Sequence, residues 1–411
     1  MKNIVIFYEH VVREYEACLR LKEALEADGF AVVEIFSLQY QLLECIQLAR
    51  AKSFDAIVMP YVYTEKSLAP IKFILKQAQP PIVFNFHHEQ TASLFDEHKL
   101  LPRDNVAQNK VIHFVWSDFF KTKLTDLGIK ESQVFVTGNI RVNSMPDTTS
   151  RKCVADKYGL DGQKKWILLC ESGNIFFSTN KVDELSSRGY RAADLVSWNS
   201  YVEQTISSMV SQFKSAPDSF FDEFELIYRD HPGVERSVVF SERVKRIDDE
   251  RIGFWLPHVS AVTTRISTVL FEAEKFGVPA VRYDPEIIPS NLLPHGLERY
   301  PYIKKITDIV STLKTYSASD DPMVFEDYVG RCDVDVAEVM RSIIKNELTQ
   351  SLIDRNNYRI NLTKKYRIWP RLICNFFAPL VLKYGIKWNC RFCSSFSNIK
   401  RDGPPEWRVS Q

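Results

Sequence analysis

Carboxylate and imidazole side chains follow the short apolar runs of this 411-residue sequence, at positions where they could move protons. One run is followed by His88 and Glu89, and the N-terminal run by Glu9 and then Glu14. A glutamate in such a place can deprotonate a substrate hydroxyl while a neighbouring histidine shares the proton. We predict Glu89, with His88 beside it, as the leading general base, and Glu9 and Glu14 as the alternatives. The competing interpretation is a polar loop that caps a helix.

A second group of polar residues suits the binding of phosphate. Arg229, His231 and Pro232 follow another apolar run, and Ser267 and Thr268 stand where a helix is expected to begin. A guanidinium and an imidazole can neutralise a diphosphate, and the free N–H groups of a helix start also bind phosphate. Simple helix capping by the hydroxyls remains the alternative. The predicted nucleotide-binding set is completed by Ser172, Gly173, Arg265 and Glu272.

Short β-branched runs alternate with amphipathic segments over most of the chain, which predicts parallel sheets joined by right-handed crossovers. In such sheets ligands bind outside the carboxyl ends of the strands, where the polar residues above are found. Helices are expected over 11–25, 39–51, 192–213 and 268–276. Strands are expected at 3–7, 31–36, 55–59, 81–86, 111–116, 134–137, 166–170, 224–228, 261–264 and 279–283.

A polar, charged stretch at 147–165 divides the two series of strands and is predicted to be the linker between domains. The fold class is therefore α/β, with two Rossmann-like domains facing a cleft and a helical, basic C-terminal extension. The expected ranges are 1–146 for the first domain, 147–322 for the second domain and 323–411 for the extension.

The charge of the chain is unevenly distributed. The totals are 53 basic and 52 acidic residues, a formal net charge of +1. Residues 355–401 contain eleven Lys and Arg and no Asp or Glu, so the remainder has 42 basic and 52 acidic residues, or −10. Aromatic residues alternate with these basic ones, which favours binding to an anionic membrane surface. Packing on the body of the protein is the alternative, and no motif supports binding to nucleic acid.

Several classes of protein are not expected from this sequence. The N-terminus lacks a long apolar segment, which argues against a secretory signal, and no uncharged run reaches the roughly 20 residues of a spanning helix. The eight cysteines are then expected to be reduced thiols in the cytoplasm. Cys390 and Cys393 have the spacing of half a zinc site without a second ligand pair, so no metal is predicted.

Three short motifs resemble those of bacterial enzymes that build surface carbohydrates. His231-Pro232 with Ser267-Thr268 resembles the His-Pro and Ser-Ser/Thr motifs of CMP-sugar transferases, such as sialyl-, polysialyl- and Kdo-transferases. The stretch 263–283 also resembles CDP-glycerol transferases and nucleotide-sugar epimerases. The segment 136–141 resembles their Thr-Gly-Asn-Pro motif, with Ile140 in place of the proline.

This resemblance implies the two-domain GT-B architecture and a glycosyltransferase that uses a nucleotide-sugar donor, CMP-linked by preference. It implies that His231, Ser267 and Thr268 contact the nucleotide phosphate and that Glu272 holds the ribose. It also implies a glycan or glycolipid acceptor at the cytoplasmic face of the inner membrane, and no cofactor or essential metal. The alternatives are a nucleotide-sugar epimerase, a CDP-glycerol-type polyol-phosphate transferase and a non-catalytic scaffold.

Overall fold

A computed structural model of the 411-residue chain places most of the polypeptide in two compact units. The first consists of Met1–Gln90, Lys99–Asn143 and Gly330–Gln411, and the second of Thr91–His98 and Ser144–Val329. The residues that the structure describes are 1–90, 92–94, 97–142, 149–171, 179–187, 190–230, 242–247, 250–315, 324–331, 333–350, 359, 360, 362, 372 and 405.

The first unit contains a parallel six-stranded sheet in the order β2-β1-β3-β4-β5-β6. Its order reverses beside β1, which is the arrangement of a doubly wound fold. The strands are β1 (Lys2–Tyr8), β2 (Ala31–Ser37), β3 (Ala56–Met59), β4 (Ile82–Asn85), β5 (Ile112–Val115) and β6 (Val134–Val136).

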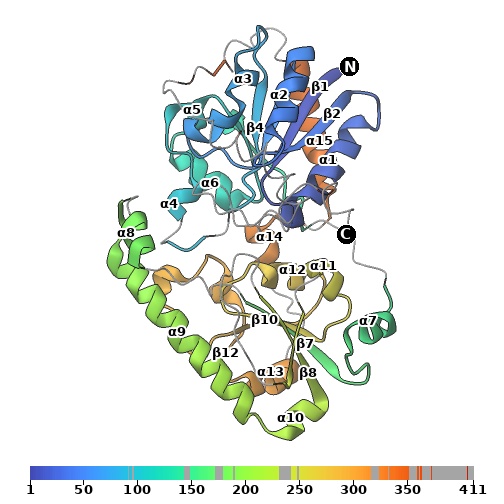
Figure 1. Ribbon diagram of the computed structural model, residues 1–411, viewed down its shortest axis with the longest axis vertical. Coiled ribbons are helices and arrows are strands. Elements are labelled where there is room, and N and C mark those ends of the chain that lie inside the picture. Colours follow the sequence, from blue (N-terminus) through green and yellow to red (C-terminus); the bar gives the residue numbers. More distant parts are fainter. Residues whose placement is uncertain are drawn as a thin grey trace. The chain divides into compact units, whose positions relative to one another are not determined.

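Helices cover both faces of this sheet, because its central strands are apolar on both sides (Figure 1). Helices α1 (Glu16–Glu26) and α15 (Val336–Gln350) pack together on one face through residues such as Leu21 and Ile344. The opposite face packs against α2 (Leu42–Ala51) and α3 (Lys72–Leu75). The other helices here are α4 (Glu97–Leu100), α5 (Asn105–Asn109), α6 (Asp118–Asp126), the π-helix Val11–Tyr15 and the 3-10 helices Glu65–Ile71 and Glu131–Gln133.

The second unit repeats this design with a parallel sheet in the order β12-β11-β10-β7-β8-β9. Its strands are β7 (Lys165–Cys170), β8 (Phe224–Arg229), β9 (Val244–Arg246), β10 (Ala261–Thr264), β11 (Ala280–Tyr283) and β12 (Tyr302–Ile303). The long helix α9 (Ala192–Ser215) buries Met209 and Phe213 against one face. The other helices are α7 (Arg151–Tyr158), α8 (Thr179–Ser187), α10 (Asp218–Glu223), α11 (Ile252–Trp255), α12 (Val269–Lys275), α13 (Ile309–Thr315), α14 (Val324–Tyr328) and the 3-10 helices Ser290–Leu292, Leu297–Arg299 and Ile306–Asp308.

All ten predicted strands are present, and the α/β class with two Rossmann-like domains is confirmed. The short strands β9 and β12 were not predicted. The predicted linker 147–165 contains α7, where Ser150 accepts a hydrogen bond from the N–H of Cys153 and Gly159 ends the helix at φ +63°. The chain returns to the first unit at Gly330. Helix α15, which lies in the range 323–411 expected for the C-terminal extension, is therefore part of the first unit.

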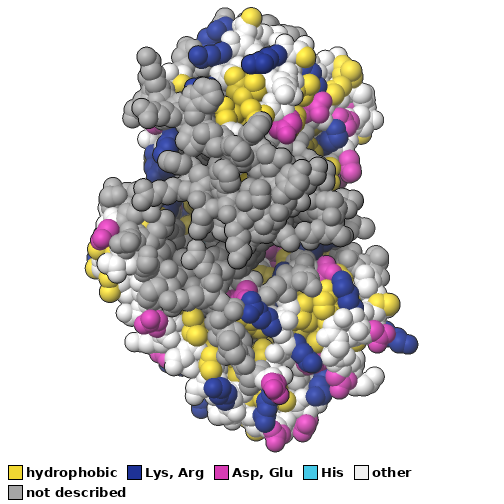
Figure 2. All heavy atoms as spheres, viewed as in Figure 1, with side chains coloured by type: hydrophobic (Ala, Val, Ile, Leu, Met, Phe, Trp, Pro, Cys, Tyr) yellow, Lys and Arg dark blue, Asp and Glu magenta, His cyan; other side chains and the backbone are white. Residues whose placement is uncertain are grey.

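Most of the basic segment 355–401 lies outside the described residues. Of its four described positions, Ile360 is buried in the core that contains α2, while Leu362 and Leu372 pack against that core. Arg359 donates to the carbonyl of Ala78. None of the described helices is long and apolar enough to span a bilayer. Lys and Arg side chains are interspersed with Asp and Glu over the described surface drawn in Figure 2.

Candidate active site

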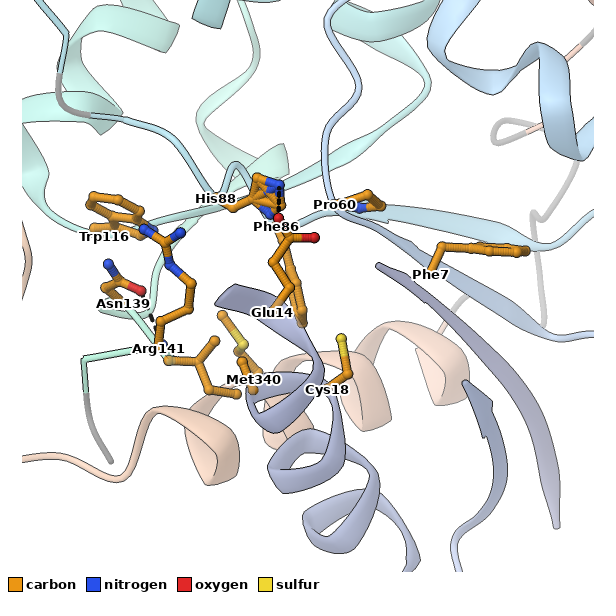
Figure 3. A pocket seen from close by; sticks show the side chains of 12 residues that line it. Phe7, Glu14, Cys18, Pro60, Phe86, His88, Trp116, Asn139, Arg141 and Met340 are labelled. Carbon is orange, nitrogen blue, oxygen red and sulfur yellow. Dashed lines mark hydrogen bonds and ion pairs between the residues drawn. The ribbon is translucent and has the colours of Figure 1, made fainter. Parts of the chain in front are cut away.

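The first unit contains a pocket with about 350 Å³ of empty space. Much of its wall follows the strands β3, β4, β5 and β6, so the pocket lies where a doubly wound sheet binds ligands. The lining residues are Phe7, Glu14, Ala17, Cys18, Pro60, Phe86, His88, Trp116, Asn139, Ile140, Arg141 and Met340 (Figure 3).

Glu14 projects into this pocket from the π-helix that precedes α1. Its Oε2 accepts hydrogen bonds from the N–H groups of Glu9 at 2.7 Å and His10 at 3.2 Å. The carboxylate therefore satisfies backbone donors at the start of the helix, where negative charge is favourable. These two hydrogen bonds fix the orientation of the Glu14 side chain, which is only 4% exposed.

The other oxygen of Glu14 pairs with His88. Its Oε1 lies 3.2 Å from His88 Nε2, and Figure 3 shows the two side chains pointing toward each other. His88 is also buried, and its N–H donates to the carbonyl of Pro60. A carboxylate beside an imidazole fixes the ring and stabilises its protonated form. The pair can therefore receive a proton from a bound substrate.

The opposite wall carries a cation on an aromatic ring. The Arg141 guanidinium lies 5.7 Å from the centre of the Trp116 ring, and the two are adjacent in Figure 3. Asn139 Oδ1 accepts from the N–H of Arg141 at 3.0 Å, which fixes the loop after β6. Arg141 Nη1 also lies 3.8 Å from Glu89 Oε1, a loose ion pair.

The structure brings only one of the three predicted catalytic residues into the pocket. His88 lines it, whereas Glu89 and Glu9 do not. Glu9 Oε1 accepts hydrogen bonds from Gln39 Nε2 and Tyr61 Oη, both at 3.2 Å. The carboxylate that joins His88 is Glu14, which the sequence left as an alternative.

The floor of the pocket is apolar and holds a thiol. Burial raises the pKa of Cys18 well above its usual value, and the nearby Glu14 carboxylate adds to this effect. The thiol is therefore protonated at neutral pH and does not act as a nucleophile. Phe7, Phe86 and Met340 complete this floor.

In the second unit, charged residues directly follow three neighbouring strands. Glu171 follows β7 and Arg265 follows β10, and their side chains form an ion pair buried from solvent. Asp284 follows β11 and accepts a hydrogen bond from Tyr201 Oη at 2.8 Å. Burial raises the pKa of Asp284 to about 6, against the opposing effect of the Tyr201 hydrogen bond. The Arg265 guanidinium also lies 5.6 Å from the Tyr201 ring.

Solved structures resemble this arrangement over most of the chain. The S. aureus MnaA–UDP co-structure has a TM-score of 0.54 at 14% identity and covers 85% of this chain and 97% of that chain. A putative UDP-N-acetylglucosamine 2-epimerase from Listeria monocytogenes has a TM-score of 0.53 at 16% identity, covering 86% and 98%. The wall teichoic acid polymerase TagF, soaked with CDPG, has a TM-score of 0.51 at 10% identity, covering 85% and 89%. The chain has the GT-B fold. No family model and no curated protein matches its sequence.

The predicted nucleotide-binding residues of this GT-B chain lie in its second unit, and some of them fall outside the described residues. Arg229, the last residue of β8, donates to the carbonyl of Glu250. Ser267 Oγ accepts from the N–H of Val269 at 3.3 Å, and Thr268 is the N-cap residue of α12, without a side-chain cap hydrogen bond. Glu272 is half-buried on α12. Four predicted residues fall outside the described part: Ser172, Gly173, His231 and Pro232.

Sequence reasoning did not identify several residues of these two sites. The pairing of Glu14 with His88 depends on a π-helix, which no pattern in the sequence predicts. Trp116 and Asp284 could have been found, because each stands at or just beyond the end of a predicted strand. Within the described residues, no group of three or more His, Cys, Asp or Glu could hold a metal ion.

Proposed function

We propose that the chain is a nucleotide-sugar-dependent glycosyltransferase in which His88 and Glu14 form the general base. The observation that carries this proposal is the buried Glu14–His88 pair on the wall of a pocket of about 350 Å³. Glycosyl transfer needs one group that takes the proton of an acceptor hydroxyl and others that stabilise the leaving phosphate.

In the proposed step, the acceptor hydroxyl attacks the anomeric carbon of the donor. The new carbon–oxygen bond forms as the bond to the donor phosphate breaks, and the nucleotide leaves with the electron pair. His88 Nε2 faces the Glu14 carboxylate as an ion pair, so Nδ1 is proposed as the nitrogen that takes the hydroxyl proton. The resulting imidazolium is stabilised by the adjacent carboxylate.

The leaving nucleotide is assigned to the second unit. His231, Ser267 and Thr268 are proposed to contact its phosphate and Glu272 its ribose, as the sequence resemblance implies. Arg229 is proposed to neutralise the phosphate through its guanidinium. The buried pair of Glu171 and Arg265 holds the carboxyl ends of β7 and β10 together beneath this group.

The donor nucleotide is the least constrained part of this proposal. The sequence motifs favour CMP, whereas the similar structures name UDP and CDPG. Melting temperatures with CMP, CDP, UDP and GDP decide between them, because a ligand that binds only the native state raises the apparent stability. A shift with UDP alone would exclude the CMP preference.

A second candidate function is epimerisation of a nucleotide sugar. It is favoured by the likeness to a putative UDP-N-acetylglucosamine 2-epimerase over 86% of this chain. The same Glu14–His88 pair would then remove a proton from carbon rather than oxygen. Incubation with UDP-N-acetylglucosamine in D₂O without an acceptor separates the two functions. Deuterium at C2 of the sugar supports the epimerase, whereas hydrolytic release of the nucleotide without C2 exchange, with water in place of the acceptor hydroxyl, supports the transferase.

The base is tested by replacing Glu14 with Gln and His88 with Ala. Each variant should lower the rate of nucleotide release from the donor at least 100-fold, because a general base contributes about 10²–10⁴. Nucleotide affinity should not change, since the nucleotide is assigned to the second unit. His10→Ala is the matched control, because His10 is a partly exposed histidine outside the pocket lining. Equal loss in the control would contradict the assignment.

We also propose that the acceptor is a surface polysaccharide or lipopolysaccharide and that residues 355–401 bind the anionic cytoplasmic face of the membrane. The support is compositional: eleven basic residues, no acidic ones and interspersed aromatics. The full chain should sediment with phosphatidylglycerol vesicles and a chain ending at Leu348 should not. Equal sedimentation of the two would refute this role. Metal-independent turnover is expected, and its complete loss in EDTA would contradict that expectation.

A further inference from the structure

His87, the residue before the proposed base, has a backbone conformation that side chains rarely adopt. It stands two residues beyond β4 with φ +46°, the only positive φ outside glycine among the residues that the structure describes. Its side chain is fully buried. Such left-handed residues persist where the surrounding structure holds them, and they cluster at functional sites.

Two side chains hold the backbone of His87 in this conformation. Its N–H donates to Asn85 Oδ1 at 3.1 Å, and its carbonyl accepts from Gln90 Nε2 at 3.0 Å. Both clamps are themselves anchored. Asn85 exchanges two hydrogen bonds with the backbone of Val62, and Gln90 Oε1 accepts from the N–H of Trp116 at 2.8 Å. The turn after β4 is therefore tied to the ends of β3 and β5.

The imidazole of His87 adds a third anchor. Its Nε2 lies 2.7 Å from His113 Nδ1, and His113 Nε2 lies 2.9 Å from the carbonyl of Ala107. A carbonyl can only accept, so the proton of neutral His113 is on Nε2, and its unprotonated Nδ1 faces His87 Nε2, which also lies 2.9 Å from Asn85 Nδ2. The Phe120 and His87 rings also pack in an edge arrangement, with their centres 5.4 Å apart. The ring thus connects the turn after β4 to the centre of β5.

We infer that His87 is a positioning residue for the chemistry: its anchored, left-handed backbone presents His88 to Glu14. His88 is the next residue in the chain and its Nε2 must stay within 3.2 Å of Glu14 Oε1 for the pair to act. The clamping residues Asn85 and Gln90 and the ring partner His113 do not line the pocket. They therefore hold the turn that carries His88 from outside the pocket lining. The inference rests on the proposed function only in taking His88 as the base.

Two variants separate the backbone of His87 from its ring. His87→Ala removes the ring and disfavours the left-handed conformation, whereas His87→Asn also removes the ring but tolerates that conformation. Turnover of the donor should fall at least 10-fold in His87→Ala and less than 3-fold in His87→Asn. If His87→Ala does not fold, His87→Ser replaces it with the same expectation, because serine also lacks the ring and disfavours the left-handed conformation.

A double-mutant cycle distinguishes positioning from general support of the fold. A residue that acts only through His88 has no further effect once His88 is gone. In a His88→Ala background, His87→Ala should therefore change the residual turnover less than 2-fold. An undiminished 10-fold loss in that background would overturn the inference. Phe54→Leu is the control for loss of buried volume in the same unit, and its effect should be the same in both backgrounds.

An activity-independent readout uses diethyl pyrocarbonate, which acylates unprotonated imidazole, with mass spectrometry of the full chain. His88 is buried and paired, so its release in His87→Ala should raise its rate of modification at least 5-fold. The rate at His10 should stay constant. Unchanged reactivity of His88 would overturn the inference even if the wild type transfers sugar. Absence of turnover in the wild type would instead refute the proposed function, and the modification rates would still decide whether His87 positions His88.

Discussion

Lowering the pH should destabilise the first unit through two buried histidines, His87 just beyond β4 and His113 within β5. His113 is fully buried, and burial lowers its pKa from 6.5 to about 4, while burial also lowers the pKa of His87. The folded state therefore favours neutral rings, whereas the unfolded chain takes up protons below about pH 6.5. The pKa of these histidines is lower in the folded than in the unfolded protein. The stability that depends on their neutral rings is therefore fully present above the unfolded pKa, and it is lost as the pH falls toward the folded pKa.

The size of the effect follows from the shift of His113. Each pKa unit corresponds to about 1.4 kcal/mol, so a shift from 6.5 to about 4 gives a limit of roughly 3 kcal/mol. At about pH 4.5 most of this limit has been lost, roughly 2–3 kcal/mol. His87 adds to the loss in the same direction. The marginal stability of folded domains makes this a large fraction of the total.

Hydrogen exchange measured by mass spectrometry at increasing urea gives the free energy of opening for single peptides. Peptides from β4 and β5 should lose this stability between about pH 7.5 and 4.5. The comparison is His113→Gln, which keeps an amide donor for Ala107 and cannot titrate. The variant should lose roughly 2–3 kcal/mol less than the wild type over this range. Equal losses in the two proteins would refute the reasoning.

Two further predictions concern stability. Glu171→Ala should lower the free energy of unfolding of the second unit by about 3–5 kcal/mol in urea titrations, because it removes the carboxylate that forms an ion pair with the buried Arg265 guanidinium. The double change of both residues to Met should restore much of this loss, and a larger loss in the double variant would contradict the explanation. Gly330→Ala should cost at least about 2 kcal/mol, because φ is +109° and a Cβ would lie 2.4 Å from the carbonyl oxygen of Trp116. Its control is Gly29→Ala, where φ is +69° with nothing within 4 Å, and equal melting temperatures of the two variants would refute the steric part of the argument.

The sheets were predictable from the sequence because parallel strands buried on both faces consist of β-branched runs such as Ile4–Val5–Ile6. The strands β9 and β12 were not, since they have only three and two residues and lie at sheet edges. The helix α7 was missed because its residues are polar and only Val154 and Ala155 are buried.

The candidate site was predictable in position but not in its partners. The rule that ligands bind beyond the strand ends led to His88 and to Glu14 as an alternative. The choice of Glu89 was guided by its place next to His88, yet adjacent residues on an extended chain point in different directions. Glu14 reaches His88 from a different part of the chain, on a π-helix. Its carboxylate accepts hydrogen bonds from the N–H groups of Glu9 and His10, which come just before that helix.

The central claim is that Glu14, through His88, is the base of a nucleotide-sugar enzyme. The most direct test is the rate of nucleotide release from UDP- and CMP-linked sugars by the wild type, Glu14→Gln and Glu89→Gln. We predict turnover by the wild type, at least a 100-fold loss in Glu14→Gln and less than a 5-fold change in Glu89→Gln, because Glu89 does not line the pocket. Full activity of Glu14→Gln, with the loss in Glu89→Gln instead, would contradict the claim.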